Sequence, residues 1–305
     1  MPDGYSGCRV LVTGASGFIG TRLCARLHEQ GALVHGVSRT PRHGGFVEWH
    51  AGDVANREHV QAIFARVRPQ VVFHLAGETR AAREVALVPL TFDANLASSV
   101  HVMAAGVESG TERVVVAGSQ EEPAEGAPDS IPTSPYAASK WAATRYARMF
   151  HALYGLSTVS LRIFMVYGPG QRDLDKLIPH VIRTLLQGKA PVINSGDRRV
   201  DWIHVGDVAE GLALAGRAPG IEGAQIDVGS GRLVTIREIV ETLAALVAPE
   251  IRPVFRGREF ARPLEQERVA NADATFRSLG WRARVPIAEG LRETVDWLKG
   301  RREAS

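Results

Sequence analysis

The sequence of 305 residues contains only two cysteines, Cys8 and Cys24. Two cysteines cannot form a framework of disulfides, and neither stands at a metal-ligand spacing, so we expect no metal site and a reducing, cytoplasmic location. No apolar run approaches the ~20 residues that a membrane-spanning helix needs. The first residues also lack the basic flank and apolar stretch of a signal peptide. The expectation is a soluble protein with no membrane partner.

The chain also lacks a marked excess of one charge. It has 36 Lys and Arg against 33 Asp and Glu, for a formal net charge of +3. This mild basic excess is compatible with an anionic small molecule but does not indicate nucleic-acid binding. Hydrophobic residues make up 45% and charged residues 23% of the chain, a composition that is typical of globular proteins and excludes disordered and fibrous ones.

The first half of the sequence alternates short β-branched runs with amphipathic helical stretches. Apolar residues at intervals of four after residue 18 predict a first helix, and further helices are expected over 60–67 and 96–107. This alternation predicts an α/β protein with a doubly wound parallel sheet. The expected strands are short, apolar runs at residues 9–13, 33–37, 46–49, 71–75, 113–117 and 158–164. Beyond about residue 157 the rhythm becomes mixed, with late helices expected over 236–246 and 287–297.

A glycine-rich segment, TGASGFIG at residues 13–20, joins the first expected strand to the first expected helix. Glycines at intervals of three let the backbone turn tightly, approach a pyrophosphate and pack the helix on the sheet. The helix N-terminus then offers unpaired N–H groups and its positive dipole end to the phosphates. The strand before and the helix after favour dinucleotide binding over a structural turn. The predicted contacts are Gly14, Ser16, Gly17, Phe18, Ile19 and Gly20.

The end of the second expected strand bears on which dinucleotide binds. An acidic residue there usually contacts the ribose hydroxyls of NAD, whereas this strand runs into Ser38 and Arg39. A guanidinium can clamp a 2′-phosphate with two hydrogen bonds, so the sequence favours NADP over NAD; a merely solvated arginine is the alternative. Asp53 and Val54 are candidates for the adenine end, although Asp53 is equally suited to cap the next helix.

Tyr136 and Lys140 stand four residues apart, just after Pro135, on an expected helix. One helix face then presents both side chains, and an ammonium beside a phenol is expected to lower the pKa of the phenol. Such a tyrosine can exchange a proton with an alcohol while a hydride moves to or from a nicotinamide. Ser119, after the fifth expected strand, could hydrogen-bond the same substrate oxygen. The spacing alone is common by chance, and its position in the fold gives it weight.

Together these motifs resemble the extended short-chain dehydrogenase/reductase family, and more narrowly its nucleotide-sugar epimerase/dehydratase branch. The resemblance covers about residues 8 to 298. It implies a Rossmann dinucleotide-binding domain over residues 1–165 and a smaller substrate-binding α/β lobe over 166–305, partly interleaved with the first, in a homodimer. It rests on residues 13–20, Leu75-Ala76-Gly77, Asn95, Ser119, the Tyr136/Lys140 pair, LRIF at 161–164 and YGPG at 167–170.

The resemblance also implies roles for single residues. Tyr136 would be the catalytic acid/base, Lys140 would bind the nicotinamide ribose and lower the tyrosine pKa, and Ser119 would assist at the reacting carbonyl. Asn95 would hold the active-site helix in place. Leu75, Ala76 and Gly77 would also contact the cofactor. Substrate, a nucleotide-diphosphate sugar, would be contacted by Glu121, Met165, Lys176, Arg199 and Arg262.

Departures from the family pattern bear on the reaction. Met165 replaces a customary asparagine, and Val200 precedes Asp201 where the family carries an arginine, with Arg199 one residue earlier. Gln120 cannot titrate, so Glu121 supplies only half of the acid/base pair that dehydration requires. Because Ser38 and Arg39 favour NADP, an NADPH-dependent 4-ketosugar reductase is the preferred interpretation. A 4-epimerase or 4,6-dehydratase with retained NAD, a ketoreductase of a non-sugar small molecule and a non-catalytic NADPH-binding module remain open.

Overall fold

The computed structural model describes residues 4–123, 130–257 and 267–303, which belong to two compact units. The first unit comprises Met1–Ile163, Ala209–Asp227 and Asp273–Trp281. The second comprises Phe164–Val208, Val228–Ala272 and Arg282–Ser305. Two late segments of the chain therefore return to the first unit.

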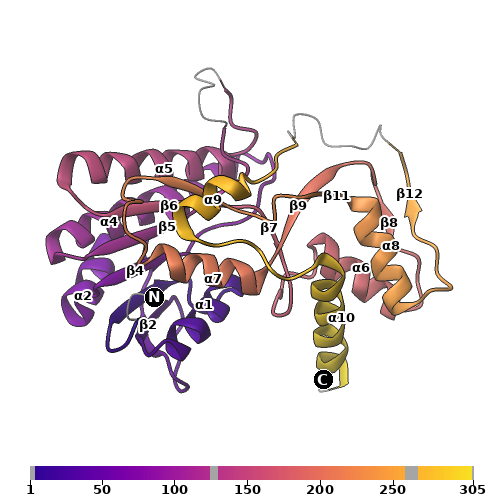
Figure 1. Cartoon of the computed structure of the whole chain (residues 1–305), viewed down its shortest axis with the longest axis horizontal. Helices are drawn as coiled ribbons and strands as arrows, with labels where there is room; N and C mark the ends of the chain where they lie inside the picture. Colours follow the sequence, from indigo (N-terminus) through magenta and orange to yellow (C-terminus); the bar gives the residue numbers. More distant parts are fainter. Residues whose placement is uncertain (1–3, 124–129, 258–266, 304–305) are drawn as a thin grey trace. The chain divides into compact units, whose positions relative to one another are not determined.

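A seven-stranded sheet forms the centre of the first unit (Figure 1). Its strand order is β10-β6-β5-β4-β1-β2-β3. The pairs β1–β2, β1–β4, β2–β3, β4–β5 and β5–β6 are all parallel. The predicted doubly wound parallel α/β fold is thus confirmed. The strands are β1 (Arg9–Thr13), β2 (Leu33–Ser38), β3 (Glu48–Ala51), β4 (Val71–His74), β5 (Arg113–Ser119), β6 (Thr158–Ile163) and β10 (Gln225–Val228).

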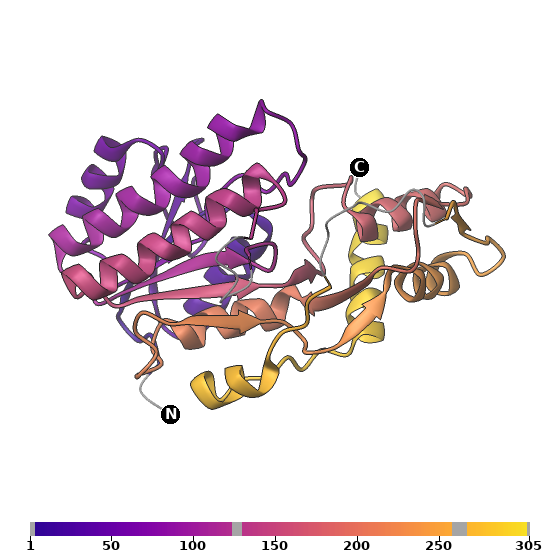
Figure 2. The ribbon, with the colours of Figure 1, turned by 90° about the horizontal axis from the view of Figure 1, so that it is seen from above.

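Helices cover both faces of this sheet. Helices α2, α4 and α5 lie on one face, and α1 and α7 lie on the other (Figures 1 and 2). The core under α2, α4 and α5 includes Leu11, Phe64, Val72, Met103 and Val114, and burying each such side chain stabilises the fold by about 1.5–3 kcal/mol. The helices are α1 (Phe18–Glu29), α2 (Arg57–Val67), α3 (Leu87–Thr91), the π-helix η1 (Phe92–Ala97), α4 (Ser98–Ser109), α5 (Pro135–Tyr154), α7 (Val205–Ala215) and α9 (Ala272–Leu279).

Several element boundaries differ from the sequence-based ones, and the starts of β3 and α4 are two of them. Strand β3 begins at Glu48, two residues after the expected start, because a turn with positive φ at Gly44 and Gly45 occupies the preceding residues. The helix expected from residue 96 is α4, which begins at Ser98 and continues the π-helix η1. Periodicity located both elements but not their ends.

The second unit holds a three-stranded sheet in the order β11-β9-β7. Its core includes Ile182, Leu185, Trp202, Leu243 and Leu291. Both late helices expected from the sequence are confirmed, as α8 and α10. The elements are β7 (Met165–Tyr167), α6 (Leu177–Leu186), β8 (Val192–Ile193), β9 (Arg199–His204), β11 (Leu233–Thr235), α8 (Ile236–Val247), β12 (Val254–Phe255) and α10 (Ile287–Glu303). Within the described ranges, no helix has the length and apolarity needed to cross a bilayer.

A buried histidine links two strands to a helix beneath the glycine-rich segment. His74, at the end of β4, is 2% exposed. Its Nδ1 lies 2.8 Å from Thr13 Oγ1 and its Nε2 lies 3.2 Å from Ser98 Oγ. Burial, with a smaller contribution from the Lys140 charge, lowers the pKa of His74 to about 3. The imidazole is therefore a neutral core group at physiological pH.

Because the buried His74 is neutral, we expect the free energy of unfolding of the protein to depend on pH in the acid range. Below pH 6.5 the unfolded chain binds a proton at His74, whereas the folded protein keeps His74 neutral. The free energy of unfolding therefore decreases as the pH falls below that value. His74 can change the free energy of unfolding by up to about 1.4 kcal/mol per pH unit. In denaturant unfolding between pH 5 and 6.5, His74→Gln is expected to flatten the pH dependence, whereas the exposed control His28→Gln keeps it. Parallel profiles for wild type and His74→Gln would contradict this assignment.

Candidate functional site

The glycine-rich segment packs directly against the end of β4. Gly14 has φ 67°, and a Cβ on it would stand 2.8 Å from the Ala76 nitrogen and 2.9 Å from the Leu75 oxygen. A Cβ on Gly20 would collide with the Gly14 carbonyl oxygen. Gly17 is the N-cap of α1, without a side-chain hydrogen bond to the helix, and the first turn carries no acidic residue. The N-terminus of α1 thus suits an anionic ligand.

Asn95 connects the segment after β4 to helix α5. Its Oδ1 accepts from Glu78 N at 2.8 Å, and its Nδ2 donates to Glu78 O at 3.1 Å and to Ser139 Oγ at 2.9 Å. A Cβ on Gly77 would stand 2.5 Å from Asn95 Oδ1 and 3.5 Å from Lys140 Nζ. Asn95 belongs to the π-helix η1, a distortion that often marks functional sites. The arrangement brings Gly77, Asn95 and Lys140 together.

Ser119, Tyr136 and Lys140 meet where β5 ends and α5 begins. Ser134 caps α5 by accepting from Ala137 N at 3.1 Å, and Pro135 occupies the first turn. Lys140 Nζ donates to Ala117 O at 2.9 Å, and the Ser119 side chain lies close enough to the Tyr136 phenol to lower its pKa. The side chains expected to be catalytic therefore lie close together, on two consecutive elements.

The expected lowering of the tyrosine pKa is wrong for the protein alone. Burial raises the pKa of Tyr136 to about 12; the nearby Ser119 side chain opposes this increase, and the charges of Glu121 and Glu122 add to it. Burial also lowers the pKa of Lys140 to about 8, against the opposing charge of Glu122. Desolvation of the phenolate thus outweighs any attraction from the ammonium.

Glu122, which sequence reasoning did not assign to the site, is more buried than Glu121. It is 1% exposed, and its Oε1 accepts from Ser119 N at 2.7 Å while its Oε2 accepts from Gln225 Nε2 at 2.8 Å. Burial raises the pKa of Glu122, and the hydrogen bonds from Ser119 N and Gln225 oppose that shift. The Glu122 carboxylate therefore holds the backbone N–H of Ser119 in position.

A polar chain supports Glu122 from β6 and β10. Arg162 donates to Gln225 Oε1 at 2.7 Å and to Asp227 Oδ1 at 3.0 Å. The signal for this arrangement in the sequence is Gly118, because a Cβ there would stand 2.5 Å from Glu122 Oε1. A glycine inside a strand often marks the close approach of another group.

The residues expected at the adenosine end of the cofactor lie after β2 and β3. Ser38 is buried as the last residue of β2, and Arg39 is exposed. Asp53 is exposed and accepts from Ala55 N at 3.0 Å, with partly buried Val54 following it. The alternative role of Asp53 as a helix cap is wrong, because Asn56 caps α2 by accepting from His59 N.

The residues expected to contact substrate are divided between the units. Glu121 lies in the first unit, where its backbone N donates to Ser119 Oγ at 3.2 Å. In the second unit, Met165 begins β7, and Lys176 precedes α6 with its Nζ 4.0 Å from Asp173 Oδ2. Arg199 begins β9, with its Nε 3.1 Å from Glu267 Oε2. Arg262 lies outside the described residues.

Two conspicuous carboxylates of the second unit have structural roles. Asp201, fully buried in β9, accepts from Ser230 N at 2.7 Å, Gly231 N at 3.0 Å and Ala270 N at 2.9 Å. Asp207 accepts from Arg284 N and Val285 N, both at 3.0 Å. These bonds fasten loops to β9 and α7. These hydrogen bonds give Asp201 and Asp207 a structural role and not a chemical one.

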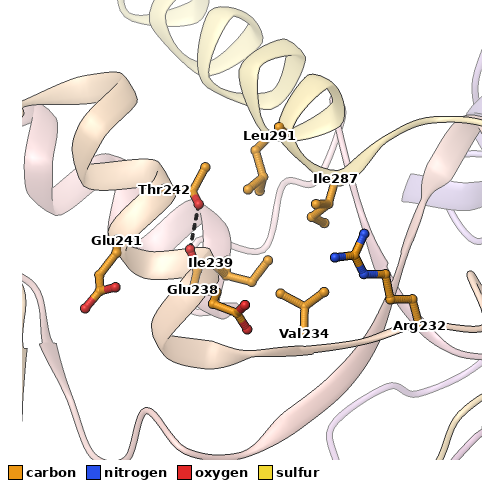
Figure 3. Close-up of a pocket in the computed structure, with 9 residues that line it drawn as sticks. Arg232, Val234, Glu238, Ile239, Glu241, Thr242, Ile287 and Leu291 are labelled. Carbon is orange, nitrogen blue, oxygen red and sulfur yellow. Dashed lines mark hydrogen bonds between the residues drawn. The ribbon is translucent and has the colours of Figure 1, made fainter.

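A pocket in the second unit lies between β11, α8 and α10 (Figure 3). Val234, Ile239, Ile287 and Leu291 give it apolar walls. Glu238 also lines it, but its carboxylate accepts from Thr235 N and Thr235 Oγ1, both at 2.7 Å, within a capping box. None of the site residues expected from the sequence lines this pocket.

Comparison with known proteins identifies relatives along nearly the whole chain. The model of the NAD dependent epimerase/dehydratase family matches residues 10–229. The UDP-glucose 4-epimerase of Mycolicibacterium smegmatis is 29% identical, covering 96% of this chain and 99% of that protein. The dTDP-glucose 4,6-dehydratase of an Actinoplanes species is 30% identical, with 96% and 98% covered. The solved structure of MoeE5 with UDP-glucuronic acid and NAD is 33% identical, covers 96% of this chain and 99% of that one, and has a TM-score of 0.84. The family resemblance indicated by the motifs is confirmed.

Proposed function

Because this chain belongs to the NAD-dependent epimerase/dehydratase family of extended short-chain dehydrogenase/reductase enzymes, we propose that it is a nucleotide-diphosphate-sugar 4-epimerase with a retained NAD. The observation that carries the proposal is the cluster of Ser119, Tyr136 and Lys140 at the end of β5. Relatives named as UDP-glucose 4-epimerases and a neighbour bound to a UDP-sugar and NAD support the substrate class and the cofactor.

The described residues fit a dinucleotide. The α1 N-terminus with Gly14, Gly17 and Gly20 would hold the pyrophosphate, since added Cβ atoms at Gly14 and Gly20 would close this cradle. Tyr136 and Lys140, beside Gly77, would contact the nicotinamide ribose. The remaining proposed contacts are Ser16, Phe18, Ile19, Ser38, Arg39, Asp53, Val54, Leu75, Ala76 and Asn95.

The chemistry of the chain's own residues is proton transfer at the sugar C4 oxygen. When bound, the nicotinamide supplies a hydride acceptor and donor for the C4 carbon. Tyr136 takes the proton of the C4 hydroxyl as the alcohol becomes a ketone, and returns a proton to the same oxygen after the ketosugar has turned its other face. Ser119 donates a hydrogen bond to the C4 oxygen. Lys140 is a cation that favours the phenolate as the proton leaves the substrate.

A 4,6-dehydratase is less well supported by the segment after β5. Dehydration requires an acid/base pair that removes the C5 proton and expels the C6 hydroxyl. In the described part of this segment, residues 119–123, Gln120 does not titrate and Glu122 is buried between Ser119 N and Gln225. Glu121 supplies one member of such a pair. Epimerisation needs only Tyr136, Ser119 and Lys140.

A second candidate is an NADPH-dependent 4-ketosugar reductase. The observation that favours it is the end of β2, where Ser38 is followed by the exposed guanidinium of Arg39 and no carboxylate. A guanidinium at this place suits a 2′-phosphate. The neutral phenol of Tyr136 is also the form that donates a proton to a ketone oxygen.

The first experiment identifies the cofactor and the reaction together. Freshly purified protein is denatured, and the released nicotinamide is identified by mass spectrometry; native protein is incubated with UDP-glucose, UDP-glucuronic acid and dTDP-glucose. Near-stoichiometric NAD with interconversion of C4 epimers is the expected result. A site that binds NADPH reversibly, with turnover only on 4-ketosugars, would replace the epimerase by the reductase.

Tyr136→Phe removes the acid/base and leaves the ring in place. The expected fall in kcat is about 10²- to 10⁴-fold, with the retained cofactor unchanged. Tyr146→Phe, at an exposed position of the same helix, is the control and should keep full activity. Activity of Tyr136→Phe near that of wild type would remove Tyr136 from the mechanism.

Glu122→Gln tests whether the buried carboxylate positions Ser119 and tunes its neighbours. Because the Glu122 charge raises the pKa values of Tyr136 and Lys140, its removal should lower both. We expect kcat to fall about tenfold or more with little change in KM, and the pH profile of kcat to move to lower pH. Exposed Glu58→Gln is the control. A lower kcat with an unmoved pH profile would leave Glu122 a purely structural role.

Arg39→Ala separates the two cofactor assignments. If Arg39 reads a 2′-phosphate, the variant should weaken NADPH binding by about tenfold or more and leave NADH binding nearly unchanged. Arg42→Ala, whose guanidinium stacks over Trp49 at 5.6 Å, is the matched control. Equal losses for NADPH and NADH, measured by fluorescence titration, would show that Arg39 does not discriminate between them.

The homodimer and the cytoplasmic location implied by the sequence remain predictions. Exposed apolar side chains of α4 and α5, such as Val107, Tyr146 and Leu153, are compatible with a partner surface. Sedimentation of the purified chain measures its oligomeric state directly.

A further inference from the structure

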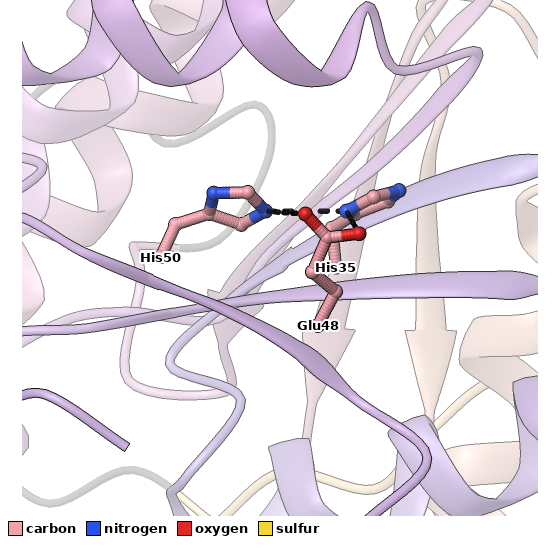
Figure 4. A group of neighbouring side chains, drawn as sticks. All are labelled: His35, Glu48 and His50. Carbon is pink, nitrogen blue, oxygen red and sulfur yellow. Dashed lines mark hydrogen bonds and ion pairs between the residues drawn. The ribbon is translucent and has the colours of Figure 1, made fainter. Parts of the chain in front are cut away.

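Two histidines and a glutamate meet on one face of the β2–β3 pair (Figure 4). His35 in β2 stands opposite Glu48 in β3, and His50 lies two residues further along β3. Side chains two residues apart in a strand share a face of the sheet. The register of two parallel strands therefore brings together three potential ligands that lack a recognisable metal-binding spacing in the sequence.

The donor atoms already stand near the separations of a metal site. His35 Nδ1 lies 3.1 Å from His50 Nε2 and 3.5 Å from Glu48 Oε2, and His50 Nε2 lies 3.8 Å from Glu48 Oε1. Around a tetrahedral ion with bonds of about 2.0–2.2 Å, neighbouring donor atoms are about 3.3–3.6 Å apart. The two imidazoles share a hydrogen bond in this structure, which an ion between them would replace, and the three donor separations would then change by a few tenths of an ångström.

The two histidines of the cluster are largely buried, and the glutamate is open to solvent. The side chains of His50 and His35 are 4% and 12% exposed, while that of Glu48 is 55% exposed and leaves a path to solvent. Burial lowers the pKa of both imidazoles, and the charge of Glu48 opposes this shift. Arg66 opposes binding: its Nη2 lies 3.6 Å from Glu48 Oε1, and an ion must compete with it for the carboxylate.

We propose that His35, Glu48 and His50 bind one divalent transition-metal ion such as Zn²⁺, with solvent as a fourth ligand. Two imidazoles and one carboxylate are the donors that zinc accepts, whereas Mg²⁺ and Ca²⁺ require oxygen ligands. Among the described strands of the seven-stranded sheet, β3 is the last in the order and lies next to β2. The ion would cross-link this edge strand to its neighbour, independently of the proposed epimerase activity.

The test uses the full chain without a histidine tag, stripped of metal with a chelator. Zn²⁺ is titrated calorimetrically, and Co²⁺ is added separately as a spectroscopic probe. We expect one ion per chain, the intense visible absorption of four-coordinate Co²⁺, and a melting temperature raised by about 3–8 °C at saturating Zn²⁺. The absence of one-to-one binding, or Co²⁺ with the weak spectrum of a six-coordinate ion, would overturn the proposal.

Variants assign the ligands. Glu48→Gln and His35→Gln should each weaken Zn²⁺ binding at least about tenfold, and exposed Glu48 can be changed without disturbing the core. His28→Gln, which removes an exposed histidine of α1, should bind as wild type. If Glu48→Gln and His35→Gln fold normally, as judged by circular dichroism, and bind Zn²⁺ like wild type, the ion lies elsewhere and the proposal fails.

Discussion

The parallel register of β1, β4 and β5 is the constraint on which the candidate site depends. Thr13 pairs with His74, and His74 pairs with Val116, in one row across the sheet. The residues that follow this row emerge at the same edge: the glycine-rich turn, Leu75 to Gly77, and Ala117 to Ser119. Since the carboxyl ends of parallel strands meet, segments far apart in the sequence form one site. The hydrogen bonds of His74 to Thr13 and Ser98 tie β1, β4 and α4 together beneath it.

Two ionisable side chains are buried at the candidate site. Lys140 and Glu122 are both buried, and each has hydrogen-bond partners: Ala117 O for the ammonium, and Ser119 N and Gln225 for the carboxylate. Burying a charge is costly unless it is hydrogen-bonded. The same desolvation keeps the Tyr136 phenol protonated at neutral pH. A cationic group close to the phenol would favour the phenolate, and in that form Tyr136 can act as a base.

The sequence was sufficient for the sheet, for the glycine-rich turn after β1 and for the proximity of Ser119, Tyr136 and Lys140, because these depend on local signals: β-branched runs, glycine spacing and a four-residue helical repeat. It could not show Glu122, whose partner Gln225 is 103 residues away, nor the inverted shift of the Tyr136 pKa, which depends on burial. The histidine cluster of β2 and β3 likewise depends on strand register. The start of β3 was misplaced because two glycines lengthen the turn before it.

In the proposed reaction, Tyr136 moves the proton of the C4 oxygen, and the hydrogen on C4 moves as a hydride that never exchanges with water. The most direct measurement uses a UDP-hexose carrying deuterium at C4, incubated with the protein in ordinary water. The expected result is that the C4 epimer forms with its deuterium retained, as measured by mass spectrometry and NMR. An epimer that has exchanged deuterium for solvent hydrogen would contradict hydride transfer, and the absence of any epimer would contradict the proposed reaction.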